Sequence, residues 1–178
     1  HGACHYPCVS INLSMGLLRD TRTGPRLLQY IDQCGIQPSN LRIELLESTL
    51  LDERSVTIVK NVQHLISLGF AVELDDFRTG HAAIATLRKF DVSRIKIDRS
   101  LVENIDSEPE LREITGAIIN LAERLNIQVL AEGVETQDEQ ATLNELGCSV
   151  AQEYLHARPM PIMQLRAWIR DWQTSVAT

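Results

Sequence analysis

Six short, β-branched apolar runs recur along the chain, and a longer segment with helical spacing of apolar residues follows each of them. We predict one strand for each run, at residues 9–13, 41–45, 70–75, 94–98, 127–132 and 150–154. Successive strands that are joined by helices form right-handed β/α units with parallel strands. The alternation therefore predicts an α/β fold built around a parallel sheet.

Local signals mark where several of these helices begin. Ser107 with Glu110, and Thr136 with Glu139, match the capping box that opens a helix. Pro161 is suited to the first turn of a last helix. The buried stripe predicted for that helix is Ile162, Leu165, Ile169 and Trp172.

Composition limits the class of protein. The 178 residues are 44% hydrophobic, which is enough to fill the core of one domain, so we interpret residues 1–178 as a single folded domain. The 17 Lys and Arg against 24 Asp and Glu give a net charge of −7, which disfavours DNA and RNA as partners. No apolar run is long enough to span a membrane, and the four cysteines are scattered. We therefore expect a cytoplasmic domain that makes no direct contact with a membrane. A membrane anchor in upstream domains of the parent protein is compatible with this expectation.

Polar side chains end nearly every predicted strand. In chain order they are Asn12, Glu44, Asp75, Asp76, Lys96, Glu132 and Gln152. A doubly wound sheet collects ligand groups at one switch point, whereas a TIM-like (β/α)8 barrel brings the ends of many strands to one mouth. Both folds fit the alternation, and the many polar strand ends favour the barrel. Six β/α units are two short of closure, so we interpret them as strands three to eight and expect a longer protein to supply the first two.

The strand-end set is rich in hard oxygen donors. The set holds four carboxylates and two amides. The carboxylates repel one another in one mouth unless cations lie between them, and Mg²⁺ and Mn²⁺ prefer such oxygen ligands. A two-metal centre lowers the pKa of a bridging water and neutralises a phosphodiester under attack. Lys96, the cation of this set, can orient that water or stabilise developing charge. For any single residue the alternative is that an Asp or Asn at a strand end caps the next helix.

The chain resembles a known family over nearly its whole length. The segments that carry the resemblance are, in order, VSINLS, IELLES, LDDFRTG, IKIDRSLV, LAEGVET and GCSVAQEYLHARPMP. They are similar to motifs of the EAL family of cyclic di-GMP phosphodiesterases. The resemblance implies a TIM-like barrel that uses two Mg²⁺ or Mn²⁺ ions to hydrolyse the bacterial second messenger cyclic di-GMP to linear pGpG, and that Ca²⁺ inhibits. We also expect upstream sensory or GGDEF-type domains in the parent protein.

The resemblance assigns roles to the residues that match the family motifs. The implied metal ligands are Asn12, Glu44, Asp75, Asp76 and Glu132. The implied catalytic set is Lys96, which holds the catalytic water, with Glu132 and Gln152. The residues implied to support the site from the loops or from behind the ligands are Glu47, Thr79 and Glu135, of which Glu135 steadies the loop after the LDDF strand. Gln152 and Asp98 are expected to contact the ligand, and the loop and helix after Asp76 are expected to form a homodimer.

Several departures from the family pattern leave a second hypothesis open. The Glu-Ala-Leu motif, which supplies a metal ligand from an early strand, is absent. Arg78 replaces a glycine in LDDFRTG, where glycine permits a positive φ, so we expect it to distort the metal loop. The other replacements are Leu46 for threonine, Glu153 for glycine, and His81, Ala82 and Ala83 for Tyr-Ser-Ser. The alternative function is a catalytically inactive EAL domain that acts as a cyclic di-GMP receptor or protein-interaction module.

Overall fold

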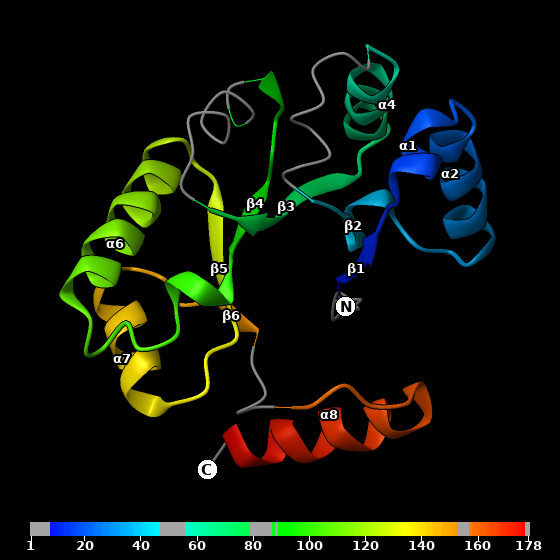
Figure 1. Cartoon of the computed structure of the whole chain (residues 1–178). Coiled ribbons are helices and arrows are strands. Elements are labelled where there is room, and N and C mark those ends of the chain that lie inside the picture. The colour runs from blue at the N-terminus through cyan, green and yellow to red at the C-terminus, as the bar shows by residue number, and fades with distance from the viewer. Residues whose placement is uncertain (1–7, 47–55, 79–86, 88, 153–156, 177–178) are drawn as a thin grey trace.

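The computed structural model describes residues 8–46, 56–78, 87, 89–152 and 157–176. Six parallel strands form one curved sheet in sequence order, which confirms the predicted parallel α/β arrangement (Figure 1). They are β1 (Val9–Asn12), β2 (Leu41–Leu46), β3 (Ala71–Phe77), β4 (Arg94–Ile97), β5 (Gln128–Glu132) and β6 (Ala151–Gln152). Because every neighbouring pair is parallel, the carboxyl ends of all six strands lie at the same edge. The end of the last predicted strand, residues 153–154, lies outside the described residues.

Most of the described helices lie around the curved sheet, and the last one lies apart from it (Figure 1). The helices are α1 (Met15–Arg19), α2 (Thr23–Gln33), α4 (Val56–Ser67), α6 (Pro109–Arg124), α7 (Gln137–Glu145) and α8 (Ile162–Val176), with two 3₁₀ turns, η1 (Pro38–Asn40) and η2 (Arg99–Leu101). Within the described ranges no helix combines the length and apolar character that a bilayer crossing needs.

The two faces of the strands differ sharply in polarity. On one face Ile43, Val72, Leu74, Ile95 and Ile97 are fully buried in the hydrophobic core. Successive side chains of a strand point to opposite faces, so the residues between these apolar ones face the inside of the curve. Those residues are mostly charged or polar, and the curved sheet therefore encloses ionic groups rather than a purely apolar filling.

One of the two predicted capping boxes is confirmed and the other is wrong. At α7 the amide of Glu139 donates to Thr136 Oγ1 at 3.1 Å, and the amide of Thr136 donates to Glu139 Oε2 at 3.0 Å. At α6 the capping residue is Glu108, which makes no side-chain cap, and Ser107 Oγ donates instead to the carbonyl of Asn104 at 3.2 Å. Pro109 lies in the first turn, and its fixed φ sets the start of the helix. The N-cap is therefore Glu108, one residue after the Ser107 on which the predicted box was based.

The predicted buried stripe of α8 is also wrong. Ile162 is 74% exposed and Trp172 is 36% exposed, while Leu165 and Ile169 are only partly buried. An amphipathic stripe is buried only where another element lies against it, and Figure 1 shows α8 apart from the helices that surround the sheet. Its apolar residues instead contact each other, since the rings of Trp168 and Trp172 stack with centroids 5.5 Å apart.

Candidate metal centre

Three carboxylates converge where β3 and β5 end. Asp75 and Asp76 are the two residues before Phe77, the last residue of β3, and Glu132 is the last residue of β5. Each offers one oxygen to a group in which all ligand atoms lie within 4.8 Å of one another. The order of the parallel strands explains this meeting, because only β4 separates β3 from β5.

A β-bulge brings two consecutive residues to this group. Leu74 pairs with Ile95 and Phe77 pairs with Ile97, so three steps along β3 match two steps along β4. In a regular strand Asp75 and Asp76 would point to opposite faces. The extra residue, together with the positive φ of 55° at Asp76, lets both carboxylates reach the same group.

Lys96 lies at the centre of the acidic side chains. Its side chain is 3% exposed, and Nζ lies 3.3 Å from Glu44 Oε1, 3.0 Å from Asp75 Oδ1 and 2.5 Å from Glu132 Oε1. Burial alone would lower the pKa of Lys96, but its close contacts with the charged carboxylates of Glu132 and Asp75 raise it well above its usual value. Lys96 is therefore a buried ammonium with a carboxylate oxygen within 3.3 Å of Nζ on each of three strands.

The carboxylates outnumber the ammonium in this part of the sheet. Burial raises the pKa of Glu132; the Lys96 ammonium opposes this rise, and the charges of Asp75 and Asp76 add to it. Asp75 Oδ1 is buried and makes no hydrogen bond of good geometry. A crowded set of oxygen donors with excess negative charge, one of them buried without a good hydrogen bond, fits a divalent cation of the Mg²⁺ or Mn²⁺ type.

The remaining strand-end residues lie at the same edge. Asn12 is the register partner of Glu44, and Gln152 is the register partner of Glu132. Both Asn12 and Gln152 are exposed. The structure thus brings all seven strand-end positions named from the sequence to one rim, with Glu44 joined to the three-carboxylate group through Lys96.

Asp98, directly after β4, caps the 3₁₀ turn η2. Its Oδ1 accepts hydrogen bonds from the amide and the hydroxyl of Ser100 at 3.0 and 2.5 Å, which caps η2, and lies 3.3 Å from Arg78 Nη2. Burial raises the pKa of Asp98, but these hydrogen bonds and the Arg78 charge lower it more. Asp98 thus has the alternative role of an Asp at a strand end, which is to cap the next helical turn. Ligand contact by Asp98 stays a prediction.

The expected supporting residues are only partly visible. Glu135 follows β5 and forms an ion pair with Arg99, with Oε1 and Nη2 2.9 Å apart. Its expected contact with the loop after β3 is not tested, because residues 79–86 lie outside the described part of the chain. The other positions outside it are Glu47, Thr79, His81, Ala82, Ala83 and Glu153.

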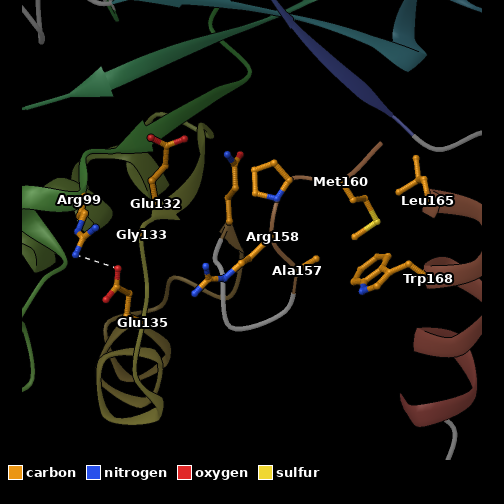
Figure 2. A pocket seen from close by; sticks show the side chains of 11 residues that line it. Arg99, Glu132, Gly133, Glu135, Ala157, Arg158, Met160, Leu165 and Trp168 are labelled. Carbon is orange, nitrogen blue, oxygen red and sulfur yellow. Dashed lines mark ion pairs between the residues drawn. The ribbon is translucent and has the colours of Figure 1, made fainter. Parts of the chain in front are cut away.

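A cavity of about 510 Å³ lies beside Glu132 and Gln152. Figure 2 shows Arg99, Glu132 and Glu135 on one side of it and the apolar side chains on the other. The apolar side is lined by Pro159, Met160, Leu165 and Trp168, and Arg158 adds a second guanidinium. The site predicted from the sequence does not include these lining residues. The signal available was their place directly after the last strand, in the segment ARPMP and the start of the last helix.

Comparison with known proteins shows the family to which the chain is similar. The model of the EAL domain matches residues 3–159. Cyclic di-GMP phosphodiesterase PdeR of Escherichia coli K12 is 34% identical over 166 residues, which cover 92% of this chain and 25% of PdeR. The chain spans only 20% to 32% of the length of such curated relatives.

Solved structures agree with the sequence comparison. The EAL domain of Mycobacterium smegmatis DcpA has a TM-score of 0.84 at 29% identity and covers 92% of this chain and 73% of that one. Klebsiella pneumoniae BlrP1 in complex with manganese and cyclic di-GMP has a TM-score of 0.79 at 29% identity, covering 85% of this chain and 39% of that one. These likenesses confirm the predicted fold, a part of a TIM-like barrel. The chain belongs to the EAL domain family.

Proposed function

We propose that this chain is part of a domain that hydrolyses cyclic di-GMP to linear pGpG with Mg²⁺ or Mn²⁺. The observation that carries the proposal is the convergence of Asp75, Asp76 and Glu132 beside the buried ammonium of Lys96. The name of PdeR and the manganese and cyclic di-GMP complex of BlrP1 support the same substrate and the same class of cation.

The proposed reaction adds water across one phosphodiester. The water oxygen bonds to phosphorus, the bond from phosphorus to the 3′ oxygen breaks, and that oxygen leaves with a proton, which yields a 5′-phosphate. The residues proposed to hold two cations are Asn12, Glu44, Asp75, Asp76 and Glu132. Such cations supply charge neutralisation at the phosphate and a more acidic water.

Lys96 is proposed to position the attacking water. Glu44, Asp75 and Glu132 fix its ammonium from three sides, so its position is set by the strand ends rather than by its own flexible stem. A water beside Nζ competes with these carboxylates for one N–H and is held by it. Loss of the ammonium is therefore expected to reduce turnover more than substrate affinity.

The cavity beside Glu132 is proposed to receive part of the dinucleotide. Its apolar side, with Met160 and Trp168, suits a planar base, while Arg99 and Arg158 offset the acidic rim near a phosphate. We propose Gln152, which lines this cavity, as a ligand contact. The loop and helix after Asp76 are proposed as a homodimer contact, which light scattering of the full-length protein can check.

The test is turnover of cyclic di-GMP by the full-length protein with Mn²⁺, with pGpG resolved by chromatography. Lys96→Ala and added EDTA are expected to abolish the product, and replacement of Mn²⁺ by Ca²⁺ is expected to suppress it, because Ca²⁺ takes more and longer oxygen contacts. A folded protein that binds the dinucleotide without releasing pGpG would contradict the proposed phosphodiesterase activity. Such a result would establish the inactive receptor, for which the Arg78–Asp98 ion pair beside the metal loop is the supporting observation.

A further inference from the structure

A second ionic layer lies inside the curved sheet, deeper than the candidate metal centre. Glu73 is 1% exposed, and its Oε1 lies 3.3 Å from Arg42 Nη1 and 3.1 Å from Arg94 Nη1. Ser10 Oγ donates to Glu73 Oε2 at 3.2 Å, and Arg94 Nη2 donates to Gln128 Oε1 at 2.8 Å. We call Arg42, Glu73 and Arg94 the lower layer. It carries one net positive charge.

The lower layer follows the candidate metal centre strand by strand. Each of its members precedes a member of the rim by two residues on the same strand. The pairs are Arg42 and Glu44 on β2, Glu73 and Asp75 on β3, and Arg94 and Lys96 on β4. Two residues along a strand keep the same face and advance by about 7 Å, so these charges lie directly beneath the acidic rim.

Stability alone does not account for this layer. Buried ion pairs are often no more stabilising than well-packed apolar side chains, because removing the charges from water is costly. Glu73 Oε1 and Arg94 Nε, moreover, are buried and make no hydrogen bond of good geometry. The layer does present fixed charge about 7 Å from the rim. Two of its members, Glu73 and Arg94, are buried, and charge on buried groups acts more strongly than in water.

We propose that the net charge of the lower layer tunes the affinity of the rim for divalent cations. Arg42 and Arg94 hold this affinity down, and Glu73 offsets them in part. All three act through the rim and touch neither cation nor substrate. The inference rests on the proposed metal centre and goes beyond it, because it assigns a role to three charged residues that the proposed reaction does not use.

The test compares uncharged polar variants that change the charge of the lower layer in opposite directions. In the full-length protein, stripped of metal with EDTA and then freed of the chelator, Mn²⁺ affinity is measured by calorimetry. Arg42→Gln is expected to tighten Mn²⁺ binding about tenfold, and Glu73→Gln to weaken it about tenfold, as expected for unit charges near a divalent ion. Arg42→Lys, which keeps the charge, should leave the affinity unchanged.

The double variant Arg42→Gln with Glu73→Gln separates charge from packing. It restores the original net charge, so its Mn²⁺ affinity should return to that of the wild type although the contacts are gone. A purely structural role predicts weaker binding for both single variants and weaker still for the double, and that pattern would overturn the proposal. Arg124→Gln and Glu113→Gln, exposed on α6, are the matched controls with no expected change.

Two further outcomes separate this inference from the proposed function. If the wild type binds Mn²⁺ and Asp75→Asn abolishes binding, but Arg42→Gln and Arg42→Lys bind equally, the lower layer has no tuning role and the metal centre stands. If the wild type binds no Mn²⁺, the proposed metal centre and the tuning role of the lower layer are both wrong. Should Glu73→Gln not fold, the partly exposed Arg42 still decides the question through its Gln and Lys variants.

Discussion

Removing the Lys96 ammonium should destabilise the metal-free protein severely. Lys96→Met keeps an unbranched side chain only one atom shorter and leaves Glu44, Asp75 and Glu132 without the cation that now lies within 3.3 Å of each. Breaking a buried ion pair from one side costs about 3–5 kcal/mol, because the remaining charge stays buried. For a chain of this size each kcal/mol lowers Tm by about 2–4 °C, so we expect a fall of about 6–20 °C.

The assay is thermal unfolding of the full-length protein in EDTA, followed by circular dichroism. Lys60→Met, on the exposed side of α4, is the control and should shift Tm by no more than about 1–2 °C. Mn²⁺ should raise Tm more in Lys96→Met than in the wild type, because cations can compensate the carboxylates that lost their partner. Equal Tm values for the two variants in EDTA would refute the view that Lys96 holds the acidic side chains together.

The structure also predicts how the difference in Tm between the wild type and Lys96→Met changes with pH. The pKa of Lys96 is raised above the unfolded value of 10.5, so its contribution to stability is complete below that pH and is lost as the pH rises through the higher folded pKa. The gap in Tm between wild type and Lys96→Met should therefore stay constant from neutral pH to about 10 and narrow only above 10.5. A gap that narrows between pH 6 and 9 would contradict the assignment.

Three other changes have outcomes that follow from the structure. Glu139→Gln should lower the free energy of unfolding in urea at pH 7 by about 1–3 kcal/mol, because the buried carboxylate accepts three backbone N–H groups. Burial raises the pKa of Glu139, but these hydrogen bonds lower it by more. The difference in stability should therefore disappear as the pH falls below 4.5 and the carboxylate becomes protonated. Gly133→Ala should cost about 1–2 kcal/mol in the same assay, since φ is 72° and a Cβ would lie 2.7 Å from Arg99 Cγ. Asp75→Asn should lower Mn²⁺-dependent turnover at least about 100-fold.

Each of these changes has a control elsewhere in the described chain. Glu113→Gln on α6, Gly16→Ala on α1 and the exposed Asp91→Asn repeat the same substitutions away from the contacts in question. A pH-independent cost at Glu139, or a Gly133 variant as stable as the Gly16 variant, would contradict the respective reasoning. Turnover that survives in Asp75→Asn would remove Asp75 from the metal centre.

Local spacing predicted what depends on neighbours in sequence. The short β-branched runs of the strands and the Thr136–Glu139 box are properties of a few consecutive residues, and both appear as expected. The Ser107 box failed although its spacing is the same, because Pro109 fixes where α6 begins. Burial of Ile162 was not predictable from α8 alone, since it depends on what lies against the helix.

The rim was predictable, but its internal geometry was not. Parallel strands bring their ends together whatever their side chains are, so the polar strand ends alone identified the edge where Asp75 and Glu132 meet. The position of Lys96 among three carboxylates depends on distances across strands. The lower layer around Glu73 was missed for the same reason, because its residues look like ordinary strand charges in the sequence. The substrate came from the family resemblance alone.

The bulge in β3 has a consequence for how the rim can acquire a ligand. Phe77 pairs with Ile97 and is buried in the hydrophobic core, just as it would be if the strand ran from Asp75 to Phe77 without the intervening residue. The ladder therefore resumes in phase after Asp76. The second carboxylate is an insertion rather than a replacement, so a chain can gain or lose it by the length of one residue while every other β3 side chain keeps its face.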